Sequence, residues 1–475
     1  MKLHKSLAVI GLAALLAGSA SAKSYKRGVS ENKFQYKAQM EVLAPGVSWF
    51  YNWSNTIGAY LADQEFLEFV PMCWNGNFSS DNIRNYVLSH PETKYILGFN
   101  EPNFTAQANM TPQQAAERWP EIQALAKELN LKIVAPALNY SPNPPYTNPT
   151  TWMDEFVALV GSDAFDFVAL HNYGGVGVMQ SLCTTFHERY GKPVWLTEFC
   201  YWPGESGAVP LQSQIDSMVE SVEWLEKTDW IYRYAWFKAT EASVANYHLL
   251  ESGKGEEPRS LTEAGMVYVN LSDFDPAVYH EINLAVPAVD YIDRQYASLG
   301  KGANINCAKP IEITSFVAGA WLDYQFDVPA SDNYTLQLTV SGIGEPQRFN
   351  PAISVVSIDA DGSEGSVLVD NYKFQLPGSN DVYTTVNLPL QLQAGKQTIR
   401  LKDVNPYAPS GLHISTVKLA NAAGIADLTT EDAPALVNVY SIQGALICSD
   451  ADPVTIKAQL TPGLYIIGDK KVIIR

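Results

Sequence analysis

Two glutamates lie at the carboxyl ends of apolar runs that are typical of buried strands. Glu101 follows the letters GFN, and Glu198 lies within WLTEF. An unpaired carboxylate is costly to bury, so such residues are usually functional or held in an ion pair. Hydrolysis of a glycosidic bond requires two carboxyl groups, one that protonates the leaving oxygen and one that attacks the anomeric carbon. Glu101 and Glu198 are therefore our candidate catalytic residues, and a structural ion pair is the alternative.

Aromatic and amide side chains lie next to the same strand ends. Sugar rings present flat C–H faces that stack on aromatic rings, while amides and hydroxyls bind their hydroxyl groups. The candidate substrate-binding residues are Asn100, Tyr51, Trp53, Trp74, Asn75, His171, Tyr173, Trp202 and Trp236, and Trp49 is a further strand-end ring. We expect Asn100 to bind the 2-hydroxyl of the sugar being cleaved and Tyr173 to orient Glu198. Each ring taken alone could equally serve core packing.

Eight short apolar runs must position these residues. They occupy residues 26–30, 47–53, 69–74, 95–100, 132–138, 165–173, 193–199 and 230–237, and amphipathic helical patterns separate them, most clearly at 112–129 and 211–227. Strands that alternate with helices form parallel sheets, and eight such units predict a (β/α)8 barrel, whose active site lies at the carboxyl ends of the strands. Glu101 and Glu198 would then face each other across one cleft. A doubly wound sheet is the alternative, but its glycine-rich first turn is missing after residue 28.

Composition and motifs exclude several other classes of function. The formal charge of -18 disfavours nucleic acid and anionic membranes as partners. The sequence contains no HExxH, GxSxG or Walker motif. Its five cysteines are scattered, their odd number leaves at least one thiol unpaired, and the histidines are dispersed. We therefore expect neither a metal nor a cofactor.

Changes in composition and in the pattern of apolar residues divide the chain into four parts. Residues 1–22 combine Lys2 and Lys5 with a short apolar run and the letters ASA, which predicts a signal peptide cleaved after Ala22 and export from the cell. Residues 23–272 form the predicted barrel. Alternating β-rich runs predict an antiparallel sandwich over residues 273–421 and a small β-rich domain over residues 422–475. The expected fold class is thus α/β, a barrel followed by all-β domains.

Seven blocks, in order, resemble glycoside hydrolase family 128 of clan A. They are KRGVS, GVSWFYNW, FVPMCW, ILGFNEPN, FVALHNYGG, PVWLTEFCYW and YAWF, and they span about residues 26–270. The resemblance implies a retaining endo-β-1,3-glucanase that acts on polymers such as laminarin, with Glu101 as acid/base and Glu198 as nucleophile. The linkage comes from this resemblance alone. A β-1,4-glucanase or mannanase on the same barrel, or a surface protein that binds glycan without cleaving it, are the alternatives.

The two C-terminal parts carry resemblances of their own. The segment from GAWLDYQFDV to LQAGKQTIRL is similar to family 6 carbohydrate-binding modules, with Tyr383 at a sugar-stacking position and Trp321 at a fold-supporting one. Ser415 stands where that family has a calcium-binding aspartate, which puts both calcium and sugar binding in question. The last segment resembles the C-terminal sorting domains of Bacteroidetes secreted proteins, which implies secretion or retention at the cell surface.

Overall fold

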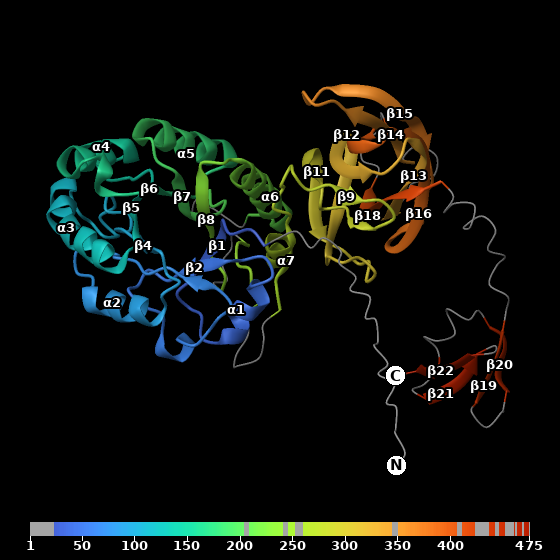
Figure 1. The fold of residues 1–475 in the computed structure, drawn as a ribbon, viewed down its shortest axis with the longest axis horizontal. Coiled ribbons are helices and arrows are strands. Elements are labelled where there is room, and N and C mark those ends of the chain that lie inside the picture. The colour runs from blue at the N-terminus through green and yellow to red at the C-terminus, as the bar shows by residue number, and fades with distance from the viewer. Residues whose placement is uncertain are drawn as a thin grey trace, which may run out of the picture.

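The computed structural model describes residues 23–203, 209–240, 246–251, 260–343, 350–405, 411–422, 437–441, 446–451, 460, 463–467 and 470–474. These residues form a helix-covered barrel, an antiparallel β domain and a four-stranded C-terminal sheet (Figure 1). The predicted signal peptide, residues 1–22, lies outside the described residues.

Eight parallel strands close into the barrel, which confirms the predicted fold class. They are β1 (Arg27–Ser30), β2 (Trp49–Tyr51), β3 (Glu68–Phe69), β4 (Tyr95–Leu97), β5 (Lys132–Leu138), β6 (Phe167–Asn172), β7 (Val194–Phe199) and β8 (Ile231–Phe237). The sheet runs in the order β3-β2-β1-β8-β7-β6-β5-β4. The ring closes between its two ends, because the amide of Leu97 donates to the carbonyl of Pro71 and the amide of Cys73 donates to Leu97, both at 2.9 Å.

Helices cover the outside of the barrel. They are α1 (Lys37–Leu43), α2 (Ser80–Ser89), α3 (Pro112–Leu129), α4 (Pro149–Val160), α5 (Val176–Tyr190), α6 (Leu211–Lys227) and α7 (Glu263–Asn270). Short 3-10 turns follow β2 (Ala59–Leu61) and α4 (Ser162–Ala164). The predicted helices 112–129 and 211–227 are confirmed as α3 and α6. Helix α3 begins where Thr111 and Gln114 form a reciprocal capping box around Pro112, and it ends at the left-handed Asn130.

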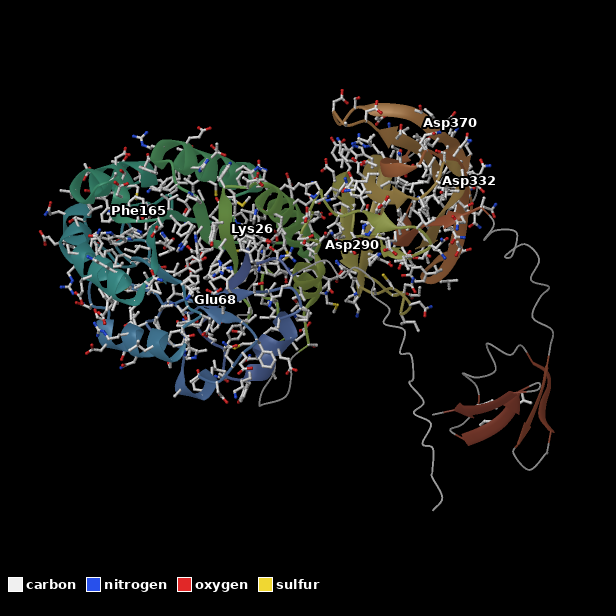
Figure 2. The ribbon with its side chains drawn as sticks, in the orientation of Figure 1. Lys26, Glu68, Phe165, Asp290, Asp332 and Asp370 are labelled. Atoms are coloured by element: carbon white, nitrogen blue, oxygen red, sulfur yellow. The ribbon has the colours of Figure 1, made fainter. Side chains whose placement is uncertain are left out.

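Aromatic rings and one arginine fill the amino-terminal half of the barrel. Trp49 and Trp195 pack edge to face with ring centroids 5.1 Å apart, and the guanidinium of Arg233 lies 5.1 Å from the Trp195 ring centroid. Arg233 also forms a 2.6 Å ion pair with Glu68, which Figure 2 labels. Trp49 is fully buried in this floor, so its predicted place at the sugar-binding end is wrong. Because the floor is packed, the interior of the barrel is closed below, and we look for the active site at the carboxyl ends of its strands.

The antiparallel β domain follows the barrel. Its strands are β9 (His280–Glu281), β10 (Val286–Pro287), β11 (Asp293–Lys301), β12 (Ile311–Val328), β13 (Asp332–Gly342), β14 (Ala352–Ile358), β15 (Glu364–Lys373), β16 (Ser379–Leu392), β17 (Gly395–Asp403) and β18 (Leu412–Asn421). The C-terminal sheet contains β19 (Val437–Ser441), β20 (Leu446–Ala451), β21 (Gly463–Ile467) and β22 (Lys470–Ile474), in the order β20-β19-β21-β22.

Strand β11 joins the two larger units by lying along helix α6. Near the amino-terminal face of the barrel, Glu223 accepts hydrogen bonds of 2.6 Å from both Arg294 and Tyr291. Toward the opposite face, the side chain of Gln212 donates to the carbonyl of Leu299 at 3.1 Å. β11 therefore runs from the floor of the barrel toward the face that carries the strands' carboxyl ends.

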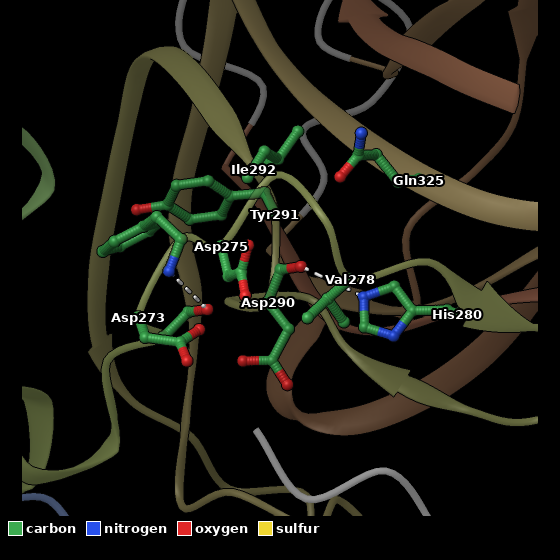
Figure 3. A pocket seen from close by; sticks show the side chains of 10 residues that line it. Asp273, Asp275, Val278, His280, Asp290, Tyr291, Ile292 and Gln325 are labelled. Carbon is green, nitrogen blue, oxygen red and sulfur yellow. Dashed lines mark hydrogen bonds between the residues drawn. The ribbon is translucent and has the colours of Figure 1, made fainter. Parts of the chain in front are cut away.

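The segment that connects α7 to β9 is held at the same junction. A small pocket lies beside it, and Figure 3 shows His280 and Asp290 facing each other there, joined by a 3.4 Å contact from the imidazole to the Asp290 carbonyl. Asp290 in turn pairs with Lys309 at 2.5 Å. Arg27, from the first strand, donates to the carbonyls of Leu271 and Ser272. The connecting segment is therefore hydrogen-bonded to β1 of the barrel at its start and to Asp290 of the β domain at its end.

Candidate active site

An irregularity in β7 turns Glu198 into the barrel. Along β6 and β7, Leu170 pairs with Leu196 but His171 pairs with Glu198, so Thr197 is an extra residue on β7. Such a bulge reverses the alternation of side chains beyond it. Trp195 points into the barrel, and Leu196 packs outside it. Regular alternation would turn Glu198 outward, and the bulge turns it inward instead.

A second irregularity, at the end of β4, positions Glu101. Leu97 belongs to the interior of the barrel, whereas Phe99, two residues on, packs outside against Trp119 of α3 with centroids 5.6 Å apart. Gly98 lies between them, and a β-carbon there would stand 2.9 Å from the carbonyl oxygen of Val134. Only glycine permits this close approach. Glu101 has a left-handed backbone (φ 42°) and a side chain that is 9% exposed.

Three donors hold the carboxyl group of Glu198. Its Oε1 accepts hydrogen bonds from the Tyr51 hydroxyl at 3.0 Å and from the Trp53 indole at 2.7 Å, and its Oε2 accepts one from the Tyr173 hydroxyl. Burial, and then the Glu198 charge, raise the pKa of Tyr51 and of Tyr173 well above the ordinary value, so both hydroxyls stay protonated. Because an ionised carboxylate only accepts hydrogen bonds, this set of donors favours the ionised form of Glu198.

His171 lies between the two glutamates and is fully buried. Its Nδ1 stands 2.9 Å from Oε1 of Glu101, and its Nε2 stands 3.4 Å from Oε1 of Glu198. Burial lowers the pKa of His171, but the charges of Glu198 and Glu101 outweigh it, and the net shift is upward. Burial raises the pKa of Glu198, against the opposing effects of His171, Tyr173 and Trp53. The protonation states of His171 and Glu198 therefore depend on each other.

An open cavity of about 390 Å³ lies over Glu101 and Glu198. It is lined by Asn100, Glu101, Gln107, Tyr173, Glu198, Trp202 and Phe237. Trp202 is 36% exposed and meets Tyr173 edge to face. The amide nitrogen of Asn100 donates to Gln107 at 3.3 Å, and its buried oxygen has no hydrogen-bond partner among the described residues. That oxygen can accept a hydrogen bond from a ligand hydroxyl.

The structure separates the predicted substrate-binding residues into groups. Asn100, Tyr173 and Trp202 line the cavity, whereas Tyr51, Trp53 and His171 lie behind it and contact the carboxyl groups directly. Trp74 is partly buried against the interior of the barrel, and the Asn75 side chain accepts from the amide of Asn77 in its own turn, so neither lines the cavity.

The prediction for Trp236 is wrong. This ring is 1% exposed, donates to the carbonyl of Tyr247 at 2.7 Å and packs against Phe199 outside the barrel. Phe237, one residue further along β8, faces the cavity instead. Sequence reasoning also missed Gln107, which comes from the loop after β4, where no periodic pattern indicates which side chain turns inward.

Other kinds of site are not seen in the described part of the chain. No group of three or more histidine, cysteine or acidic residues there could hold a metal ion. Within the same residues no helix is long and apolar enough to cross a membrane. Cys73, Cys183, Cys200 and Cys307 are free thiols.

Comparisons with known proteins give three kinds of match. A family model described as "Glycosyl hydrolase catalytic core" matches residues 28–268. Alkali-sensitive linkage protein 1 of Schizosaccharomyces pombe is 28% identical over 237 residues, which are 47% of this chain and 40% of that protein, so the chain spans less than half of the relative's length.

Two solved structures share more of the sequence. One is a subgroup II endo-β-1,3-glucanase of glycoside hydrolase family 128 from Pseudomonas viridiflava, at 35% identity, covering 52% of this chain and 98% of that one, with a TM-score of 0.49. The other is the corresponding enzyme of Sorangium cellulosum, at 32% identity, with the same coverage and a TM-score of 0.45.

Proposed function

Because the chain belongs to the glycosyl hydrolase catalytic core family, we propose that it is a retaining endo-β-1,3-glucanase that uses Glu101 and Glu198. The observation that carries the proposal is the pair of buried carboxyl groups, both in contact with His171, beneath an open cavity lined by Trp202 and Phe237. The proposed linkage rests on the seven sequence blocks that resemble glycoside hydrolase family 128.

In the first step, Glu198 attacks the anomeric carbon while Glu101 protonates the oxygen of the departing glucan. The bond between that carbon and oxygen breaks as an ester to Glu198 forms. In the second step, Glu101 removes a proton from water, the water oxygen attacks the same carbon, and Glu198 leaves as a carboxylate. The two inversions together retain the anomeric configuration.

The surroundings of Glu198 support a nucleophile, and hence retention over inversion. In a retaining enzyme the second carboxylate attacks the anomeric carbon, whereas in an inverting enzyme it activates a water molecule. Glu198 accepts hydrogen bonds from Tyr51, Trp53 and Tyr173. These donors suit a nucleophile, because they stabilise the carboxylate that leaves in the second step.

Product analysis tests the proposal directly. Laminarin and curdlan should release a series of oligosaccharides, and proton NMR during the first minutes should show the β-anomer as the initial product. Glu198→Ala should abolish release. Wild-type activity in that variant would refute the assignment, an initial α-anomer would refute retention, and faster cleavage of β-1,4-glucan or mannan would refute the linkage. Binding to glucan without any released sugar would favour the non-catalytic alternative.

We further propose that the enzyme is exported and that the β domain binds the same polysaccharide. Both proposals rest on sequence features, the leader over residues 1–22 and the similarity of residues 273–421 to carbohydrate-binding modules. In the structure the hydroxyl of Tyr383 donates to Glu312 at 2.7 Å. Mass spectrometry of the exported protein should find Lys23 as its first residue. Tyr383→Ala should weaken retention on insoluble curdlan in a Glu198→Ala background.

A further inference from the structure

Trp53 holds the nucleophile from a conformation that bulky residues rarely adopt. Its backbone lies in the left-handed region (φ 56°), while its indole N–H donates to Glu198 at 2.7 Å. A bulky side chain at positive φ persists only where its surroundings hold it in place. The neighbours of Trp53 therefore matter for the position of the Glu198 carboxylate.

Lys238 is one of those neighbours. This residue is 5% exposed, and its ammonium lies 5.7 Å from the centroid of the Trp53 ring and 5.8 Å from that of Phe237. The same ammonium donates to Oδ1 of Asn32 at 3.3 Å. A cation at this distance from an indole face is attracted to the ring, most strongly where water is excluded.

A buried carboxylate fixes the segment that carries Lys238. Glu31 has no exposed surface, and its two oxygens accept from the amides of Lys33 at 2.6 Å and Thr240 at 2.7 Å. Its Oε1 also stands 4.0 Å from the ammonium of Lys238. Glu31 therefore joins the loops that follow β1 and β8, and it places a negative charge behind the cation.

We infer that Lys238 is a positioning residue for the nucleophile and acts through Trp53. Its positive charge holds the indole in place. It also draws electron density from the ring, which strengthens the hydrogen bond that the indole N–H donates to Glu198. A Glu198 carboxylate held in this way is aimed at the anomeric carbon and is stabilised when it leaves as an anion. The inference deepens the proposed function, since it names a further residue on which the same carboxylate depends.

A double-mutant cycle with Trp53→Phe tests the inference. Lys238→Met should lower kcat about 2- to 30-fold, with a smaller change in KM, because its contact with the Trp53 ring lies behind the cavity. Trp53→Phe keeps an aromatic ring but removes the N–H, so adding Lys238→Met to it should lower kcat less than twofold further. Lys238→Arg should retain more activity than Lys238→Met. Lys192→Met is the control, because Lys192 makes a similar contact with Phe165 far from the site.

The outcomes are separable. Equal losses from Lys238→Met in the wild-type and Trp53→Phe backgrounds, or no loss in either, would overturn the inference. The thermal midpoint of each variant is measured, and Lys238→Gln replaces Lys238→Met if the latter does not fold. The cycle is run on whichever glycan the unmodified protein cleaves fastest. Failure to cleave β-1,3-glucan then refutes the proposed substrate, whereas additive losses refute the role of Lys238.

Discussion

The Nδ1 atom of His171 lies 2.9 Å from Oε1 of Glu101, inside a barrel that gives the imidazole no contact with solvent. The other ring nitrogen faces Glu198. A positive charge on His171 is therefore stabilised by both glutamates and would be costly to bury without them. A positive charge on His171 also lowers the pKa of Glu198, against the effect of burial.

The first prediction concerns stability against pH in His171→Asn. The pKa of His171 is raised by folding, so its contribution to stability is fully present below about pH 6.5 and is lost as the pH rises through the folded-state pKa. The raised pKa of Glu198 gives a slope of the same sign in both proteins, so the contrast between them comes from His171. Between about pH 6 and 9 the free energy of unfolding of the wild type should fall more than that of the variant. Urea denaturation at fixed pH values checks this, and parallel curves would contradict it.

The second prediction distinguishes the roles of the two glutamates. Glu101→Gln should lower kcat/KM for laminarin about 10²- to 10⁴-fold, because the leaving sugar oxygen needs a proton. An aryl glycoside with a dinitrophenolate leaving group needs no proton, so its glycosylation step should slow far less. Burst kinetics of dinitrophenolate release measure that step. Equal losses on both substrates would show that Glu101 does not act as the acid.

The third prediction contrasts two tryptophans. Trp202 is exposed in the cavity, so Trp202→Ala should raise KM about 2- to 12-fold, which is the range for one aromatic contact, and leave the thermal midpoint nearly unchanged. Trp236 is buried in the wall of the barrel, so Trp236→Ala should cost about 3–5 kcal/mol of stability. Steady-state kinetics and calorimetry separate the two effects. A stable Trp236→Ala variant with a raised KM would reverse our placement.

The fourth prediction concerns the contact between the barrel and the β domain. Glu223→Ala leaves the Arg294 guanidinium, which is 12% exposed, without its carboxylate and should cost about 2 kcal/mol. The control is Asp154→Ala, which breaks the exposed pair with Arg189 and should cost less than about 1 kcal/mol. Calorimetry should also resolve two transitions in Glu223→Ala where the wild type shows one. Identical traces for both variants would contradict a stabilising role for this contact.

The sequence was sufficient to predict the strands of the barrel and the two glutamates at its mouth. Eight apolar runs separated by amphipathic stretches define the order of elements, and a carboxylate at the end of such a run has few structural explanations. The helix over residues 112–129 was predictable to the residue, because its start carries a capping box with a proline and its end carries Asn130.

The orientation of side chains at the strand ends was not predictable. Both faces of a barrel strand are buried, so the apolar pattern of β8 does not distinguish Trp236, which packs outward, from Phe237, which lines the cavity. The bulge at Thr197 leaves no mark in the sequence either. The burial of Glu31 was not predictable either. Its polar neighbours indicate a surface loop, but the structure buries it completely.

The position of the bulge in β7 decides whether a folded molecule can also catalyse hydrolysis. If the extra residue were accommodated one position further along the strand, the barrel would still close, but the Thr197 hydroxyl would stand where the Glu198 carboxylate now stands. Such a molecule would show the same circular dichroism and nearly the same mass distribution in solution, yet it could form no glycosyl ester. Titration with a mechanism-based label would count only molecules whose Glu198 is in place, whereas absorbance would not distinguish the two registers.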